Sequence, residues 1–111
     1  MQALALESPE QLASIKDSEG VSLIFKHSTR CPISSMALNR IQSSPDLSNT
    51  LPQFYLLDLI AHRDLSAQVS SLFNVHHESP QILLISGGEC ILDASHMDIR
   101  PSEILEILSK R

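Results

Sequence analysis

The most constraining feature of the sequence is a short, almost continuously apolar segment at residues 21–27, which leads through a polar loop into a helix pattern. The segment holds a valine, a leucine, an isoleucine and a phenylalanine, and such a run predicts a strand that is covered on both faces. We therefore expect a central strand of a sheet. After the loop, apolar residues recur every three to four positions over residues 33–41, which predicts a helix that stops before Pro45.

Strand and helix patterns alternate along the rest of the chain. Residues 8–11 (SPEQ) have a serine N-cap, a proline at the first helical position and a glutamine three residues after the cap, which predicts a helix that ends by Gly20. The pair Gly87-Gly88 predicts the tight turn of a β-hairpin. Further strands are predicted at residues 54–59, 82–85 and 90–93, and further helices at residues 65–73 and 102–110.

The resulting element order is α-βαβα-ββ-α, which belongs to the α/β class. The two early strands should be parallel and joined by a right-handed crossover, whereas the last two strands form an antiparallel hairpin. Helices would then flank a four-stranded mixed sheet on both faces. This is the element order of a thioredoxin-like domain. We expect residues 1–111 to form one such domain, because single domains cluster near about 100–150 residues.

Composition and charge exclude several classes of protein. Eight basic residues against thirteen acidic ones give a net charge of -5, which argues against partners such as nucleic acid or an anionic membrane. No apolar stretch approaches the ~20 residues needed to span a bilayer, and the first residues lack the features of a secretory signal. We therefore expect a cytoplasmic protein, and we also expect a monomer. In that reducing compartment we expect no structural disulfide between Cys31 and Cys90.

Cys31 stands where the first strand pattern gives way to a helix pattern. Unpaired backbone N–H groups and the positive end of the helix dipole would face its sulfur there, and both stabilise a thiolate. Lys26, His27 and Arg30 are nearby candidate cations, and Pro32 would fix the helix start beside the sulfur. Because Cys31 follows a polar loop, we favour a reactive thiol over a cysteine that only packs as a small hydrophobe.

We expect Cys31 to act as a single thiol. In a dithiol site a second cysteine lies three positions further on, one helical turn away, and this position is Ser34 here. The expected chemistry is the transfer of a small-thiol adduct from a protein to Cys31, and then to another thiol by exchange. Cys90 should pack in or against the sheet, with a resolving role as the alternative.

Pro80 opens a strand pattern, although a proline cannot donate a ladder hydrogen bond. In thioredoxin-like domains a cis proline at this place faces the nucleophile. We therefore expect a cis Ser79–Pro80 bond and a Ser79 backbone that pairs with an extended substrate segment. The alternative is a trans proline that only starts a strand.

Residues 28–34 (STRCPIS) and 75–81 (VHHESPQ) resemble the YtxJ-type monothiol bacilliredoxin family. The resemblance covers nearly the whole chain, and its CPIS motif differs from the CGFS motif of monothiol glutaredoxins. It implies a thioredoxin-like oxidoreductase that removes bacillithiol from S-bacillithiolated cytosolic proteins. In that enzyme Cys31 would be the catalytic nucleophile, bacillithiol the thiol co-substrate, and no cofactor would be tightly bound. Residues 95–99 (SHMDI) also resemble a family segment near the active site.

The expected substrate-binding residues lie in these segments and are Thr29, Arg30, Pro32, Ser34, His77, Ser79, Pro80, Ser95 and His96. His77 is interpreted as a loop group near the proline that hydrogen-bonds or helps to hold a thiolate. No metal site is expected, because the adjacent His76 and His77 point to opposite faces of an extended segment and no paired metal-ligand spacing appears.

Two alternatives to a bacilliredoxin remain open. Glutathione could replace bacillithiol as the small thiol of a monothiol oxidoreductase. The other alternative, from a different class, is a non-catalytic thioredoxin-like module in which the loop at residues 28–34 and the Pro80 edge bind a partner peptide. The formation of adducts at Cys31 separates the enzyme from the binding module.

Overall fold

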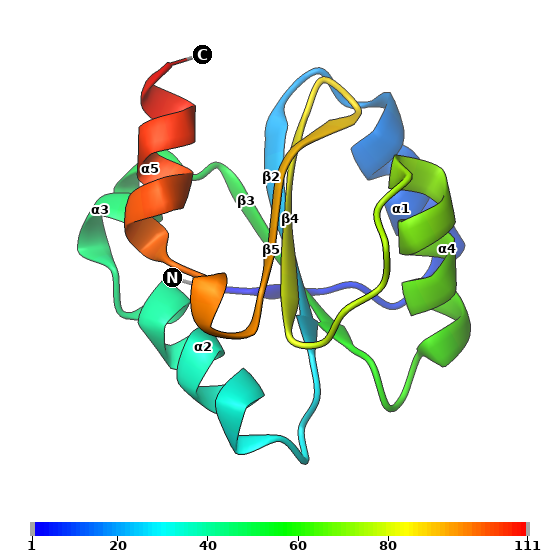
Figure 1. Cartoon of the computed structure of the whole chain (residues 1–111). Helices are drawn as coiled ribbons and strands as arrows, with labels where there is room; N and C mark the ends of the chain where they lie inside the picture. The colour runs from blue at the N-terminus through cyan, green and yellow to red at the C-terminus, as the bar shows by residue number, and fades with distance from the viewer. Residues whose placement is uncertain (1, 111) are drawn as a thin grey trace.

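The apolar segment that begins at Val21 forms β2 (Val21–His27), which is buried as far as Lys26. In the computed structural model, which describes residues 2–110, β2 is the central strand of a sheet with the order β1-β3-β2-β4-β5 (Figure 1). Its neighbours are the parallel β3 (Gln53–Asp58) and the antiparallel β4 (Gln81–Ser86). A strand that is paired on both sides and covered on both faces needs apolar side chains at most positions, which explains the run.

The sheet has five strands rather than the four that the sequence patterns predict. β5 (Glu89–Ser95) forms the predicted antiparallel hairpin with β4, whereas the additional strand, β1 (Leu4–Ala5), pairs in parallel with β3. β1 is only two residues long, so its side chains cannot show the alternation on which a strand prediction depends. The mixed sheet is confirmed, and the strand count of four is wrong.

The turn between β4 and β5 depends on its two glycines. Gly87 and Gly88 have φ angles of 58° and 79°, in the left-handed region that favours glycine. A Cβ atom at Gly88 would also overlap the backbone carbonyl of Lys16, whose own Nζ donates a hydrogen bond to the Gly88 carbonyl at 2.8 Å. The turn therefore packs directly on the end of the first helix.

Helices lie on both faces of the sheet (Figure 1). One face carries α1 and α4, and the other carries α2, α3 and α5, with the short 3-10 helix η1 next to α2. Their bounds are α1 (Pro9–Asp17), α2 (Pro32–Gln42), α3 (Pro45–Thr50), α4 (Arg63–Phe73), η1 (His96–Asp98) and α5 (Pro101–Ser109). None of the helices described within residues 2–110 is long and apolar enough to cross a membrane.

The short helix α3 is absent from the sequence prediction, although its start repeats a signal that the prediction uses elsewhere. Ser44 is its N-cap and accepts a hydrogen bond from the Leu47 N–H at 3.3 Å, and Pro45 occupies the first helical position. Ser8 and Pro9 have the same roles at the start of α1. The sequence pattern predicts only the end of a helix before Pro45, whereas this proline also begins the next helix.

Two apolar cores lie on opposite faces of the sheet. Leu23 and Phe25 of β2 belong to the core under α2, α3 and α5, whereas Ile24 belongs to the core under α1 and α4. Successive side chains of a strand point to opposite faces. The last two residues of β2 continue this alternation, so Lys26 points towards α4 and His27 points towards α2.

Candidate active site

Cys31 is the N-cap residue of α2, at the end of the loop that follows β2. Its N–H donates to the Ser28 carbonyl at 3.1 Å, and its carbonyl accepts from the Ser35 N–H at 3.1 Å. Pro32 occupies the first position of α2, as its place in the sequence predicts. The thiol is free and partly exposed. A helix N-terminus stabilises negative charge, so this position suits a thiolate nucleophile.

Ser34 is completely buried beneath the loop that carries Cys31. Its Oγ accepts a hydrogen bond from the Ser28 N–H at 3.0 Å and lies 2.7 Å from Nδ1 of His27. In a dithiol site this position holds the second cysteine, whereas here its hydroxyl ties the start of the loop to the first turn of α2. Thr29 and Arg30 are exposed in the same loop.

His27 and Lys26, both expected as cations near the sulfur, have other surroundings. Burial lowers the pKa of His27, against an opposing effect of the Asp58 carboxylate, so the neutral imidazole is favoured. Lys26 is fully buried on the α4 side, where burial lowers its pKa to about 8. The structure therefore leaves the exposed Arg30 as the neighbouring cation in the loop of Cys31.

The Ser79–Pro80 peptide bond is cis, as expected, and Pro80 is buried. Gln81 pairs with Lys26 in antiparallel register, so Pro80 lies at the sheet edge where β2 ends and the loop of Cys31 begins. Ser79 makes no backbone hydrogen bond to any other residue within 2–110, and its Oγ also lacks a partner there. Its backbone is therefore free to pair with another chain.

Ser95 and His96 lie at this edge as well. Ser95 pairs with Gln81 in the β4–β5 register, and the His96 N–H donates to the Pro80 carbonyl at 3.1 Å. The Pro80 carbonyl is thus already engaged. His96 has a φ of 54°, a left-handed conformation that turns the chain from β5 into η1, which packs against α2. The structure thus brings three segments that the sequence singled out, residues 28–34, 75–81 and 95–99, to one edge of the sheet.

His77 is exposed, but its Nδ1 contacts the buried Lys26 in a polar network that the sequence did not reveal. Nζ of Lys26 donates to the Ser66 carbonyl at 3.1 Å and to Ser70 Oγ at 2.8 Å, and it lies 3.2 Å from Nδ1 of His77. Burial and then the nearby Lys26 charge lower the pKa of His77. Gln81, which is also buried, donates to the His76 carbonyl at 2.9 Å. These bonds hold the segment that precedes Pro80 against α4 and β2.

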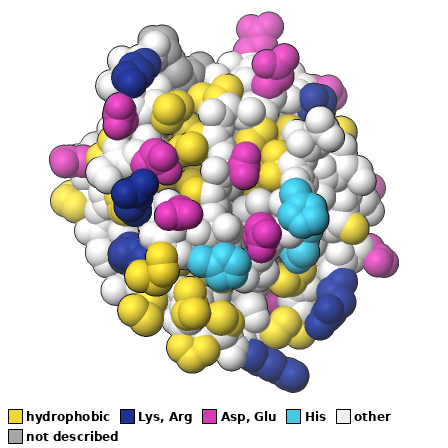
Figure 2. Space-filling view, viewed as in Figure 1, with side chains coloured by type: hydrophobic (Ala, Val, Ile, Leu, Met, Phe, Trp, Pro, Cys, Tyr) yellow, Lys and Arg dark blue, Asp and Glu magenta, His cyan; other side chains and the backbone are white. Residues whose placement is uncertain are grey.

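Exposed hydrophobic side chains lie on α2, which begins after Cys31, and on η1, which packs against α2. Ile33 and Met36, three positions apart on α2, are 44% and 57% exposed, and Met97 of η1 is 66% exposed. Figure 2 shows hydrophobic side chains gathered over this part of the molecule, at the lower left. An apolar patch of this kind is typical of a surface that contacts another protein.

Cys90 has a different environment from Cys31. Its thiol donates to the Leu92 carbonyl at 3.3 Å and packs against the core under α1 and α4. Burial raises the pKa of Cys90 to about 11, so the unreactive thiol form predominates at neutral pH. The expectation that Cys90 packs against the sheet is confirmed. Within residues 2–110, no three His, Cys, Asp or Glu side chains are grouped so as to hold a metal ion.

Comparisons with known proteins give the family and the fold. A family model described as monothiol bacilliredoxin BrxC matches residues 4–104. A solved structure described as a putative oxidoreductase with a thioredoxin fold has 30% sequence identity and a TM-score of 0.83, over 94% of this chain and 91% of that chain.

Two thioredoxins support the fold alone. The thioredoxin of Malassezia sympodialis has 17% identity and a TM-score of 0.68, over 98% of this chain and 90% of that one. The thioredoxin of Trypanosoma brucei brucei has 14% identity and a TM-score of 0.72, over 99% of this chain and 93% of that one. With a free thiol at the start of α2 and a family match over most of its length, the chain belongs to the monothiol bacilliredoxin family and is a thioredoxin-fold protein of thiol-disulfide exchange.

Proposed function

We propose that this protein removes bacillithiol from S-bacillithiolated proteins, with Cys31 as the nucleophile. The observation that carries the proposal is the arrangement at the start of α2, where a partly exposed thiol at the N-cap is followed by a buried serine instead of a second thiol. A lone thiol of this kind can accept an adduct but cannot release it by forming an internal disulfide one helical turn away.

The exchange needs two steps. The Cys31 thiolate attacks the bacillithiol sulfur of the mixed disulfide, so a Cys31–bacillithiol disulfide forms and the S–S bond to the substrate protein breaks. The released protein thiolate takes up a proton from water. A second bacillithiol thiolate then attacks the bacillithiol sulfur of the adduct, which regenerates Cys31 and yields bacillithiol disulfide. Each step exchanges one disulfide for another, so no further oxidant or reductant is needed.

Two features support the binding of a protein substrate. The unpaired backbone of Ser79 suits an extended segment that adds to the sheet edge. The exposed side chains of Ile33, Met36 and Met97 offer apolar contact near Cys31. We place the reaction in the cytoplasm, a reducing compartment that suits two free thiols. We assign it to the monomer, because the residues named for the site all come from one chain.

The test uses one model protein carrying bacillithiol on a single cysteine, and mass spectrometry follows the transfer of the adduct. We expect Cys31→Ser to abolish transfer and Cys90→Ser to keep most of it, because burial holds Cys90 as a protonated thiol. Equal loss in the two variants would overturn the assignment of Cys31.

The same model protein carrying glutathione tests the alternative thiol. Faster removal of glutathione than of bacillithiol would reassign the small-thiol substrate. A parental protein that acquires neither adduct would instead favour the non-catalytic peptide-binding module.

A further inference from the structure

Within residues 2–110, Lys26 is the charged side chain that lies fully inside the protein. Its three ammonium hydrogens have three acceptors, namely the Ser66 carbonyl, Ser70 Oγ and Nδ1 of His77. All three acceptors are neutral, and no carboxylate of the described residues forms an ion pair with it. The ammonium group therefore has its hydrogen-bond acceptors, but no negative charge compensates its positive charge. Buried charges are ordinarily paired.

A groove of about 380 Å³ lies beside this lysine, lined by Leu59, Arg63, Ser66, Ala67, Ser70 and His77. No carboxylate is among these lining residues, although the whole chain has a net charge of -5. The groove is therefore a local exception to the acidic character of the protein.

The polar groups of the groove are hydrogen-bond donors. Ser66 is 2% exposed, and its Oγ has no partner within residues 2–110. Ser70 Oγ accepts from Lys26, which leaves its O–H hydrogen available. Nδ1 of His77 also accepts from Lys26, so the neutral ring carries its proton on Nε2. With the Arg63 guanidinium, the groove presents donors above an uncompensated positive charge.

The groove is connected to the edge of the sheet that carries Cys31. The Leu59 N–H donates to the His27 carbonyl at 2.9 Å, at the point where the loop to Cys31 begins. His77 lies in the segment that leads to Pro80 at the same edge. In Figure 1 the loop before α2 and the beginning of α4 both lie at the lower end of the molecule.

We propose that this groove binds a carboxylate of the small thiol that is carried in the mixed disulfide. The inference rests on the proposed function, in which that thiol is brought to Cys31. A carboxylate accepts charge-assisted hydrogen bonds and compensates the charge of Lys26. A neutral group could accept hydrogen bonds without compensating the charge, and a cationic group would do neither. Lys26 remains mostly protonated at neutral pH, because burial lowers its pKa only to about 8.

Two forms of one thiol test the proposal. Bacillithiol, which carries carboxylates, and bacillithiol whose carboxyl groups are methyl esters are each placed on the same cysteine of the same model protein. The second-order rate constant for removal of each adduct is then measured. We expect removal of the ester to be about tenfold slower, because it loses charge-assisted hydrogen bonds in the groove.

Substitutions in the groove sharpen the test. Arg63→Gln removes the guanidinium, and Ser66→Ala removes the unpartnered hydroxyl while leaving the Ser66 carbonyl that binds Lys26. Each should bring the rate constants for the two adducts to within about threefold of each other.

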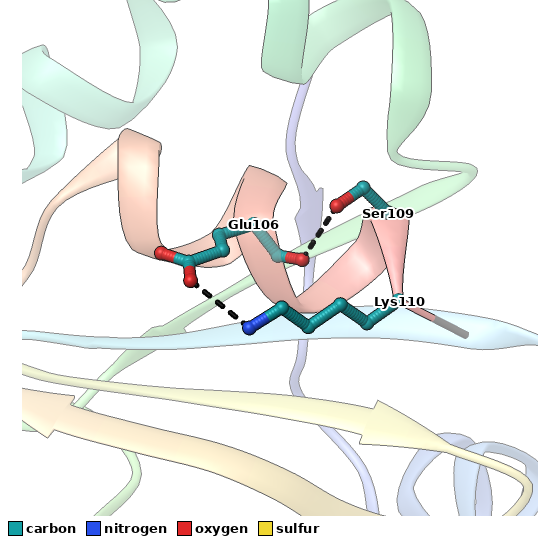
Figure 3. Close-up of polar contacts among 3 residues, drawn as sticks. All are labelled: Glu106, Ser109 and Lys110. Atoms are coloured by element: carbon teal, nitrogen blue, oxygen red, sulfur yellow. Dashed lines mark hydrogen bonds and ion pairs between the residues drawn. The ribbon is translucent and has the colours of Figure 1, made fainter.

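Lys110→Gln is the matched control, because it also removes one positive charge. Lys110 is an exposed residue whose Nζ pairs with Glu106 Oε1 at 3.0 Å at the end of α5 (Figure 3). We expect this variant to keep the full preference for the acid over the ester.

The outcomes separate this proposal from the proposed function. If the parental protein removes acid and ester at the same rate, the groove assignment is overturned and the bacilliredoxin activity stands. If Arg63→Gln slows both equally, the groove contacts the protein part of the substrate instead, which also overturns the assignment. If no adduct is removed at all, the proposed function fails, and an NMR titration with S-methyl bacillithiol tests the groove alone. Shifts of the Ser66, Ser70 and His77 amides are then expected, and unchanged spectra would refute the site.

Discussion

The two faces of the sheet hold different polar groups where β2 ends. On the α2 side, His27 and Ser34 hydrogen-bond to each other, and burial favours the uncharged imidazole. On the α4 side, Lys26 places a charge among neutral partners that include His77. Two adjacent residues of one strand thus fix two loops, one that carries Cys31 and one that leads to Pro80. The contact between His27 and Ser34 costs little electrostatic free energy. The buried charge of Lys26 carries a desolvation cost, which indicates a role beyond stability.

The largest expected effect comes from removing the buried, charged side chain of Lys26 on the α4 side of the sheet. Lys26→Ala removes a fully buried side chain and leaves Ser70 and His77 without their donor, so it should lower the free energy of unfolding by about 3 kcal/mol. Lys26→Met loses the same hydrogen bonds but fills the space and removes the desolvation cost of the charge, so it should change stability by less than about 1 kcal/mol. Urea unfolding measures both. Equal destabilisation by the two substitutions would mean that the charge itself holds the network together.

Ser34→Ala tests the uncharged contacts of Ser34 on the α2 side of the sheet. It removes the acceptor of the partly buried Ser28 N–H and the partner of His27, so we expect a loss of about 2 kcal/mol in the free energy of unfolding. The exposed neighbour Ser35 provides the control, because Ser35→Ala should stay within about 0.5 kcal/mol of the parental protein. Thermal unfolding of both variants would reveal whether Ser34 is as important to the loop of Cys31 as its bonds indicate.

The dependence of stability on pH tests whether the buried Lys26 is charged. Burial lowers the pKa of Lys26 from 10.5 to about 8, so the unfolded chain retains this proton over a pH range in which the folded chain has lost it. The contribution of Lys26 therefore makes the protein more stable as the pH rises from about 8 to 10.5. Cys90 acts in the opposite direction between 9.0 and about 11, because its folded-state pKa is raised.

The experiment is therefore run in a Cys90→Ala background. Urea midpoints should rise with alkaline pH in this background and stay flatter when Lys26→Met is added. Identical pH profiles in the two proteins would contradict the assignment of a charged, buried Lys26.

The smallest effect concerns two serines of α4. Ser70→Ala removes an acceptor of Lys26 and should cost about 1 kcal/mol, whereas Ser66→Ala removes a hydroxyl without a partner and should be neutral within about 0.5 kcal/mol. Chemical unfolding of the pair at pH 7 gives the difference. A larger cost at Ser66 than at Ser70 would show that the Ser66 hydroxyl already has a partner inside the folded protein.

Local signals in the sequence were sufficient for much of the fold and for the position of Cys31. The apolar run at β2, the serine-proline start of α1 and the glycine pair before β5 each act within a few residues, so a single segment reveals them. Cys31 was placed correctly at a helix start for the same reason, since a polar loop followed by a helical pattern marks that junction.

The missing parts depend on contacts between distant segments. The contact between Lys26 and His77 joins residues 51 positions apart, and nothing in either segment indicates the other. The burial of Ser34 follows from the way the loop folds back over α2, which a helical pattern does not specify. The two-residue β1 exists only because β3 offers it an edge. The candidate groove was therefore invisible in the sequence, while the loop of Cys31 was not.

The edge strand β5 also has a consequence for how the protein behaves at high concentration. An unpaired strand edge is a template on which a second chain can pair, and unprotected edges of this kind lead to aggregation. β5 is the last strand of the sheet, and its exposed residues include Glu89 and Asp93. A second copy added along this edge would bring like charges together in one ladder, which is unfavourable. These two carboxylates thus protect the free edge against self-association while the apolar patch near Cys31 remains open to other proteins.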